Sequence, residues 1–422
     1  MSFPALQAWL FSVVLVEFRL RIVCCWYLFS LMLETRKHSL EAAATLSGLH
    51  KSQFSRFLKN HPDLAVNNLN RLSRRQAQGY AKVLKRLKKK GPLPWTIAIL
   101  IDSTLQHRSD RRTENVQKFN HGKGYVSGHQ WTNIVLLIDD QIIPLAPIPF
   151  HSKSYCRQNG LQYRTEHDLL VEYIEHLNLE EYVGYHNPQD VVVLGDSGYD
   201  DKKIERAIVN KKWHFIMALK KKRSVKSNKA YATTQKSQSW SQVADFFKAH
   251  RRLKWQTIRV FTGQFKRKRM EFRIRETMGY LRYVAEIQLV CSEFKKRSDG
   301  RRKYLACSDL KATARQILIG YRLRWKIELF HKNVKMHLGF EDVSTQRFSA
   351  VLAHVHWVYC AYILLNASPP GIPPTIRSIP ERQALLKRII ESKETSRIRQ
   401  LLTRIGGINE FKNELECALE PC

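Results

Sequence analysis

The pattern of apolar and polar positions begins with an unusually apolar stretch, residues 3–33, rich in Leu, Val, Phe, Trp and Cys. Three charged residues, Glu17, Arg19 and Arg21, lie in its middle, and a charge at the centre of a bilayer costs about 2.5 to 3.5 kcal/mol on the insertion scale. No basic segment precedes the stretch and no small-residue cleavage site follows it, as a signal peptide requires. We therefore expect a helix that is buried or packs against a partner, rather than a membrane span.

Residues 38–58 predict two short helices with a turn at Gly48. Small residues allow the first helix to approach closely, and Phe54 and Phe57 anchor the second helix inward. The outward positions then carry residues that can read bases and phosphates: His50, Lys51, Ser52, Gln53 and Arg56. The pattern predicts a helix-turn-helix that contacts DNA through Lys51, Gln53 and Arg56, with an ordinary helical hairpin as the alternative.

A basic run follows over residues 71–90, with nine Lys or Arg and no acid. It ends at Gly91–Pro94, where two prolines and a glycine predict a domain boundary. We therefore predict an N-terminal helical domain over residues 1–91.

From residue 95 the pattern changes to alternating strands and helices. A buried strand, 95–102, ends on Asp102, and a second, 190–194, is followed by Asp196. The other predicted elements are a hairpin (132–138 and 141–149), two helices (167–177 and 200–209) and a strand (213–219). This order of strand, hairpin, helix, strand, helix, strand is that of an RNase H-like α/β sheet.

Residues 220–305 interrupt this order with further alternating segments, which predict a β-rich insertion. Its expected strands are 256–261, 270–275, 283–291 and 303–307. Two long helices, 312–338 and 352–365, follow it. The chain therefore divides into the N-terminal domain, an RNase H-like domain over 95–366 with this insertion, and a helical C-terminal region over 367–422.

The charge balance narrows the class of partner. The chain has 71 Lys and Arg against 37 Asp and Glu, a formal net charge of +34, far more than solubility requires. The electrostatic field of such a positive chain attracts polyanions. The aromatic residues interleaved with the basic ones favour nucleic acid over an anionic membrane as the partner. Three basic clusters in the insertion, 220–223, 266–269 and 295–297, predict a DNA track, with ordinary solvated faces as the alternative.

The cysteines and histidines suggest no further site. The eight cysteines have neither the density of a disulfide-rich domain nor zinc-finger spacing, so we expect reduced thiols in a cytoplasmic protein. The sixteen histidines are scattered and show no zinc-binding spacing. No P-loop is present, and nothing in the sequence suggests use of ATP.

The candidate chemistry lies in three carboxylates. Asp102 or Asp196 alone would be interpreted as a cap or turn former. Glu328 changes this interpretation, because it lies in the predicted helix 312–338. At about 100° per residue, four residues would fall within an arc of roughly 60°: Tyr321, Arg324, Glu328 and Lys335. An adjacent apolar arc would face the core: Leu323, Ile327, Phe330 and Val334.

These four polar residues match the YREK signature of a branch of bacterial insertion-sequence DDE transposases, Tyr-x2-Arg-x3-Glu-x6-Lys. Ile101–Thr104 and Leu194–Tyr199 resemble the first and second aspartate motifs of that family. The separations also agree, because 196 − 102 = 94 residues and 328 − 196 = 132 residues leave room for the family's β-rich insertion. The resemblance covers roughly residues 35–366, and the apolar first 33 residues are not typical of the family.

The resemblance implies a catalytic, metal-binding trio of Asp102, Asp196 and Glu328. Carboxylates suit Mg²⁺, which Mn²⁺ can replace, and two such ions about 3.5 to 4 Å apart can activate the attacking oxygen and stabilise the leaving oxygen of a phosphodiester. Arg324 and Lys335 would bind phosphates. Tyr321 would contact the DNA backbone or a base, or else pack at the helix edge.

The sequence thus predicts a transposase that cleaves the terminal inverted repeats of its mobile element and joins them to target DNA. We expect a homodimer in the DNA end complex and no membrane association. An RNase H-like nuclease that cuts without joining remains an alternative. A non-enzymatic DNA-binding regulator is a second alternative, and the intact carboxylate trio argues against it.

Overall fold

The computed structural model describes residues 3–33, 37–87, 93–109, 112–120, 124–228, 239–250, 253–262, 268–295 and 302–404. These residues form two units, one over 73–332 and one that combines the described residues up to Leu72 with those from Asn333 onward. The predicted boundaries at residues 91 and 366 do not coincide with these units, and the three predicted domains stay predictions. Parts of the basic clusters 266–269 and 295–297, and residues 405–422 of the predicted C-terminal region, lie outside the described residues.

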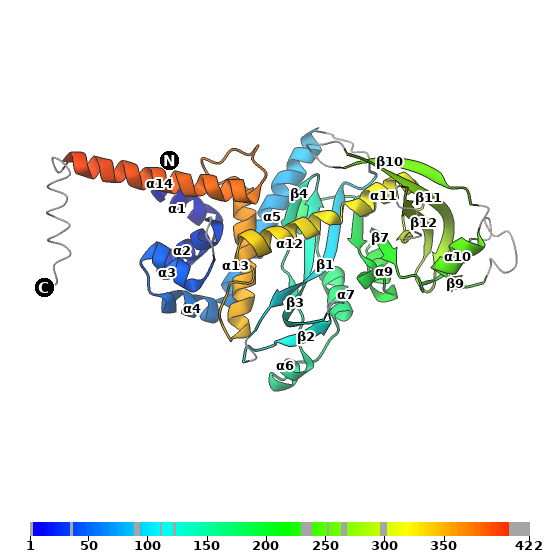
Figure 1. Cartoon of the computed structure of the whole chain (residues 1–422), viewed down its shortest axis with the longest axis horizontal. Coiled ribbons are helices and arrows are strands. Elements are labelled where there is room, and N and C mark those ends of the chain that lie inside the picture. The colour runs from blue at the N-terminus through cyan, green and yellow to red at the C-terminus, as the bar shows by residue number, and fades with distance from the viewer. Residues whose placement is uncertain are drawn as a thin grey trace. The chain divides into compact units, whose positions relative to one another are not determined.

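The unit over residues 73–332 is built on one mixed sheet with the strand order β2-β3-β1-β6-β7-β13-β12-β11-β8-β9, joined at its sides by β4, β5 and β10 (Figure 1). Its strands are β1 (Ile97–His107), β2 (Gln117–Asn120), β3 (Tyr125–Ile138), β4 (Gln141–Pro144), β5 (Ile148–Pro149), β6 (Val191–Gly195), β7 (His214–Leu219), β8 (Ser224–Ser227), β9 (Ser241–Gln242), β10 (Gln256–Thr262), β11 (Lys268–Leu281), β12 (Glu286–Phe294) and β13 (Lys303–Cys307). Its helices are α6 (Lys153–Gln158), α7 (Glu166–His176), α8 (Glu180–Val183), α9 (Lys202–Asn210), α10 (Val243–Ala249) and α11 (Ala314–Arg322).

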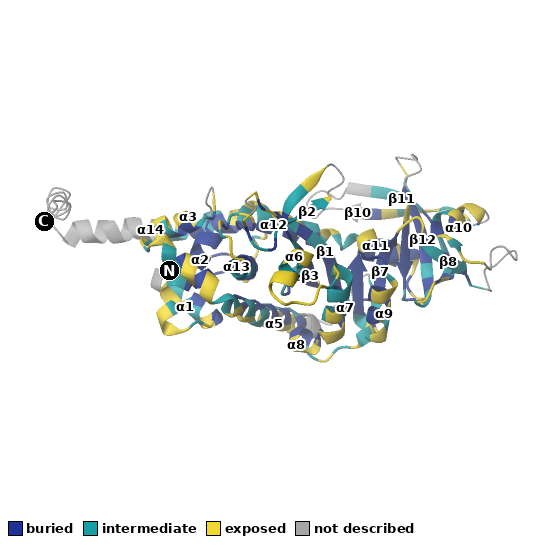
Figure 2. Cartoon of the chain, turned by 90° about the horizontal axis from the view of Figure 1, so that it is seen from below, coloured by how far each residue is buried: buried dark blue, intermediate teal, exposed yellow. Residues whose placement is uncertain are grey.

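The centre of this sheet is continuously apolar because both of its faces are covered. The first five residues of β1, Ile97–Ile101, are buried, as is all of β6. Figure 2 shows buried strands at β1 and β7. Leu170 of α7 and Ile204 of α9 belong to the same core as Ile99. β1 pairs antiparallel with β3 and parallel with β6, and β6 pairs parallel with β7. This mixed α/β arrangement fits the RNase H-like domain that the sequence predicts.

The predicted β-rich insertion forms strands and extends the same sheet. β13 pairs antiparallel with β7, with Tyr304 opposite Leu219, and β12 and β11 follow in order. The strands expected from the alternating pattern are therefore confirmed, although β11 runs beyond its predicted bounds at both ends and β12 begins and ends three residues later than predicted.

Two predicted element boundaries are wrong. Asp102 does not end its strand, because β1 continues to His107 while paired with β3. The predicted helix 312–338 is two helices, α11 and α12 (Trp325–His337). Between them the backbone forms i→i+3 hydrogen bonds, with the Arg324 N–H donating to the Tyr321 carbonyl at 3.1 Å. The four signature residues therefore do not lie on a single α-helix, because Tyr321 belongs to α11, Arg324 to the turn, and Glu328 and Lys335 to α12.

The second unit is helical, and its elements are α1 (Phe3–Val13), the 3₁₀ turn η1 (Phe18–Leu20), α2 (Arg21–Met32), α3 (Leu40–Ser47), α4 (Lys51–Asn60), α13 (Phe348–Asn366) and α14 (Ile379–Arg404). The long helix α5 (Pro62–Leu87) runs across the division between the units, as does α12. The apolar residues 3–33 thus form two helices instead of one. Glu17 and Arg19 lie between them and are exposed, so the charges avoid the buried side of α2.

Helix α13 is long and apolar enough to cross a membrane by length and composition, and 89% of its most apolar window is buried inside the protein. α2 and α4 pack against it. Tyr27 of α2 is hydrogen bonded to His354 at 2.6 Å, and the ring of Phe57 of α4 stacks on Trp357 at 5.8 Å. These contacts are those of a core helix.

The predicted pair of short helices is present as α3 and α4. Gly48 adopts φ +71° at the end of α3, a conformation that glycine adopts at no steric cost. Phe54 and Phe57 are buried, whereas Lys51 and Arg56 are exposed and Gln53 is half-buried. Contact of these three residues with DNA stays a prediction.

Candidate metal centre

The register of the sheet brings the two aspartates to one edge. Leu100 of β1 is paired with Leu194 of the parallel strand β6. Asp102 and Asp196 each lie two residues beyond these partners, and because side chains alternate along strands, residues two positions on keep the same face. β6 ends at Gly195, and Asp196 caps the 3₁₀ turn η3 (Ser197–Tyr199), its Oδ1 accepting a hydrogen bond from the Gly198 N–H at 2.7 Å.

Glu328 meets Asp102 from α12. The side chains of Asp102, Glu328 and His331 place potential metal-ligand atoms within 4.8 Å of one another. Glu328 and His331 are three residues apart and therefore neighbours on the helix surface. Asp196 lies outside this group of three, although its charge acts on Asp102. Carboxylate oxygens at such separations are the donor type that hard divalent cations prefer.

Arg324 bridges the two close carboxylates. Its Nη1 lies 3.2 Å from Oδ2 of Asp102 and 3.2 Å from Oε1 of Glu328. The guanidinium and the Asp102 carboxylate are each only 14% exposed. Burial alone would lower the pKa of Arg324, but Tyr321 and the acidic side chains raise it. The arginine is therefore held charged between the carboxylates.

The electrostatics of Asp102 suit a metal or proton site. Burial raises the pKa of its carboxyl group to about 7, the negative charge of Glu328 adds to the rise, and Arg324 opposes it. Strongly perturbed carboxylates in a charged cluster are typical of functional sites.

Tyr321 is buried at the end of α11, and the Lys303 ammonium lies over its ring at 5.0 Å from the centroid. Together with Arg324 and Trp325 it lines a cavity of about 380 Å³ beside strands β11 to β13. Trp325 is 70% exposed. The cavity is therefore partly aromatic and adjoins the carboxylates.

The remaining predicted residues belong to the helical unit. Lys335 belongs to the helical unit, where its ammonium lies 3.4 Å from Glu341. Lys51 pairs with Glu41 at 3.4 Å, and Arg56 donates to the Ser52 carbonyl at 3.3 Å. Within the unit over residues 73–332, the structure brings Asp102, Glu328, Arg324 and Tyr321 together.

Several polar residues that sequence reasoning missed support the aspartates. Asn133 lies opposite Asp102 in the sheet, and its amide nitrogen lies 2.9 Å from Nε2 of His331. With Nε2 accepting, a neutral imidazole carries its proton on Nδ1. The three-residue spacing of Glu328 and His331 could have revealed this histidine.

No motif or spacing in the sequence marks Glu166 as a residue of the site. Its carboxylate accepts hydrogen bonds from Thr132 at 2.7 Å, Gln130 at 2.6 Å and the Tyr199 hydroxyl at 2.8 Å. These partners are more than thirty residues away along the chain. The network ties the turn after Asp196 to β3.

Comparison with known families agrees with this geometry. The family model described as the transposase DDE domain matches residues 96–364, which is more than half of the 422 residues and includes all three carboxylates. A search of curated proteins finds no match.

Proposed function

Since the chain belongs to the transposase DDE domain family, we propose that it cleaves DNA at the ends of its mobile element and joins these ends to target DNA. The observation that carries this proposal is the approach of Asp102 and Glu328, with His331, to within 4.8 Å at the sheet edge that Asp196 also borders. The match to Tyr321, Arg324, Glu328 and Lys335 further supports the branch with the YREK signature.

The donor set fits the divalent metal that the family implies. Asp102, Asp196 and Glu328 would hold Mg²⁺, or Mn²⁺ in its place. When bound, a pair of such ions activates the attacking oxygen and stabilises the leaving oxygen of the phosphodiester. His331 is hydrogen bonded to Asn133, so we assign it to positioning Glu328 and not to holding the ion.

The chain's own cations would bind the substrate. Arg324 compensates the carboxylates, and its planar fork also suits a phosphate oxygen. We assign Lys335 and Tyr321 to the DNA near the reacting phosphate. Residues 1–91 would recognise the terminal inverted repeats through Lys51, Gln53 and Arg56, residues 95–366 would carry catalysis, and residues 367–422 would form a helical C-terminal region. A homodimer would hold two ends.

The test replaces each carboxylate by its amide, as Asp102→Asn, Asp196→Asn and Glu328→Gln. Cleavage of element ends in Mg²⁺ or Mn²⁺ should fall at least about a hundredfold, because each change removes a metal ligand. Mn²⁺ binding followed by calorimetry should weaken in parallel, while DNA binding in a gel shift is retained. Asp245→Asn is the matched control, since its carboxylate is exposed and pairs with Lys248.

Wild-type cleavage by any one of the three amide variants would remove that residue from the catalytic set. Joining of pre-cut ends to a target plasmid separates a transposase from a nuclease that only cuts. A wild-type protein that binds ends but never cuts them would instead be a DNA-binding regulator.

A further inference from the structure

A second cavity, of about 360 Å³, lies in the same unit and has a lining different from that of the carboxylate site. Three segments that are distant in sequence converge on it: the start of α9, the turn between β7 and β8, and the turn between β11 and β12. Five cations and one aromatic residue contribute to its lining: Lys202, Lys220, Lys222, Arg223, Arg282 and Tyr283. We call these six residues the basic pocket.

The basic pocket concentrates positive charge, and of its cations Arg223 is the one that is ion paired with described acidic residues. Four of its cations are exposed and form no ion pair with the part of the chain that the structure describes: Lys202, Lys220, Lys222 and Arg282. The acidic residue in the lining is Asp200. Its carboxylate already accepts from the Lys220 N–H at 2.7 Å and lies 3.3 Å from the Arg223 guanidinium. Like charges gathered in this way repel one another unless an anion binds.

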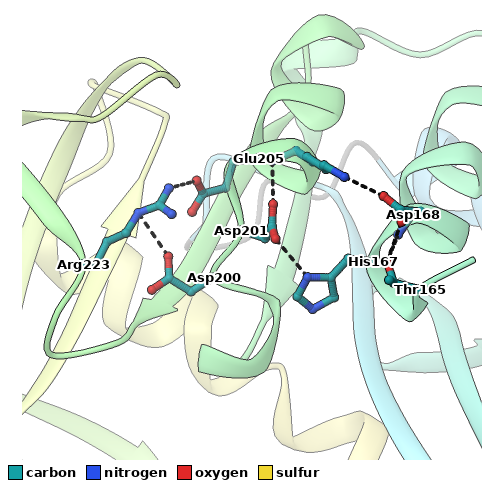
Figure 3. Close-up of polar contacts among 8 residues, drawn as sticks. Thr165, His167, Asp168, Asp200, Asp201, Glu205 and Arg223 are labelled. Atoms are coloured by element: carbon teal, nitrogen blue, oxygen red, sulfur yellow. Dashed lines mark hydrogen bonds and ion pairs between the residues drawn. The ribbon is translucent and has the colours of Figure 1, made fainter.

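Arg223 fixes the floor of the basic pocket. Its guanidinium is ion paired with both Asp200 and Glu205, whose carboxylates are buried (Figure 3). Glu205 lies on α9, so the ion pairs hold the turn between β7 and β8 against that helix. Lys220 and Lys222 are therefore presented by a turn that is anchored at its base.

Tyr283 has a backbone conformation that tyrosine rarely adopts. It has φ +64°, in a turn closed by the Val284 N–H donating to the Leu281 carbonyl at 3.2 Å, and glycine or asparagine is preferred there. The side chain is nevertheless 63% exposed. Lys202 Nζ and the Arg282 guanidinium lie 5.2 and 5.0 Å from its ring centroid. Strained residues of this kind cluster at ligand sites.

We propose that the basic pocket binds the phosphodiester backbone of DNA, at phosphates of the same strand a few nucleotides away from the reacting phosphate. This rests on the proposed function, because Asp196 is taken as a catalytic residue. Asp200 follows Asp196 by four residues, a reach of at most about 14 Å. At 3.4 Å of helix axis per phosphate, this upper limit spans at most about four phosphates of one strand. Charge complementarity and this proximity favour DNA as the occupant.

The first experiment compares the double variant Lys220→Gln/Lys222→Gln with the control Lys212→Asn/Lys248→Gln. Both remove two exposed positive charges, and the control residues lie in the turn after α9 and on α10. Asparagine suits Lys212, which has φ +58°. Affinity for a duplex carrying an element end is measured by fluorescence anisotropy over a series of salt concentrations. The pocket variant should lower the slope of log K against log salt by about two, since each lost phosphate contact removes about 0.9.

A second measurement locates the contact. The six described cysteines are buried, so Tyr283→Cys, in a chain with Cys417 and Cys422 replaced by Ser, provides a selective thiol. Disulfide cross-linking to DNA with a tethered thiol at successive nucleotides should peak within about four nucleotides of the cleavage site. Cross-linking spread evenly over the duplex would overturn the proposal.

An unchanged salt slope in the pocket variant, with normal thermal unfolding, would also overturn it. Loss of binding to anionic phospholipid vesicles without loss of DNA binding would assign the basic pocket to a membrane surface instead. None of these measurements needs cleavage. Failure of the basic pocket is thus distinguishable from failure of the carboxylate assignment, in which the amide variants keep wild-type cleavage while the pocket variant still lowers the salt slope.

Discussion

At the scale of single residues, the turn after β6 depends on two glycines that leave no space for a side chain. A Cβ on Gly195 would lie 2.6 Å from Sδ of Met217, inside the core. A Cβ on Gly198 would lie 2.9 Å from Oδ1 of Asp196, the oxygen that accepts from the Gly198 N–H. The first glycine therefore serves packing, whereas the second serves the position of a candidate metal ligand.

Gly198→Ala should consequently act on catalysis more than on folding. The added methyl group would push the Asp196 carboxylate from its place, so we expect cleavage to fall about tenfold or more, while the thermal midpoint changes little because the site is exposed. Gly79→Ala is the control, because a Cβ added to this glycine of helix α5 would meet nothing within 4 Å. That change should stabilise by about 0.5 to 1 kcal/mol and leave cleavage unchanged. Full activity of Gly198→Ala would show that Asp196 tolerates displacement.

The candidate carboxylates could be predicted from the sequence because apolar runs and motif spacing are local signals. Asp102, Asp196 and Glu328 each follow or lie within a recognisable apolar pattern. Asn133 could not be predicted because its position depends on pairing across strands, and Glu166 could not because its hydrogen bonds link α7 to β3 and Tyr199. The bridging of Arg324 between two carboxylates was also missed, since a charge pattern does not distinguish a phosphate contact from an internal ion pair.

At the scale of elements, apolar periodicity predicted most strands and helices, but not their interruptions. The division between α11 and α12 falls at Leu323 and Arg324, which carry no proline or glycine signal. β1 continues past Asp102 because β3 provides a partner up to Gly128, and that partner is specified by tertiary pairing. Both errors concern segments that bring side chains to the carboxylate cluster.

Helix α13 provides a prediction about acid stability. Burial lowers the pKa of His356 to about 4, although its Nδ1 donates to the Leu352 carbonyl at 2.8 Å. The unfolded value is about 6.5, so the unfolded chain binds the proton more tightly. Stability is complete above pH 6.5 and is lost as the pH falls toward 4, by about 3 kcal/mol in total.

Hydrogen exchange of α13 amides, corrected for the intrinsic rate, should reveal this loss between pH 6.5 and 4.5. His356→Gln should flatten the dependence. His176→Gln is a matched control, because that imidazole makes the same contact with the carbonyl four residues before it, at 2.8 Å, but is exposed. Equal pH dependence in wild type and His356→Gln would mean that this histidine is not the titrating group.

At the scale of the whole molecule, the helical unit joins the two ends of the chain. α2 and α4 pack on α13, more than 280 residues later, through the Tyr27–His354 hydrogen bond and the Phe57–Trp357 stack. No sequence pattern predicts such a pairing between distant helices. The predicted domain boundary at residue 91 therefore differs from the division of the structure into two units. The net charge of +34, in contrast, is a property of composition and needs no fold to predict DNA binding.

The last prediction follows from this pairing and concerns the fragment 1–91. Without α13 the buried faces of α2 and α4 would be exposed to water, including Phe54, Phe57 and Leu28, which are at most 3% exposed in the structure. Helices of this length are marginal alone, so the isolated fragment should have low helix content by circular dichroism and bind element ends no better than random DNA. Adding a second fragment, 333–422, should restore helix content and the preference for ends. A fragment 1–91 that is fully helical and end-specific by itself would show that recognition does not depend on α13. Arg56→Ala in the two-fragment complex tests the helix-turn-helix directly, because the exposed Arg56 guanidinium contributes little to folding.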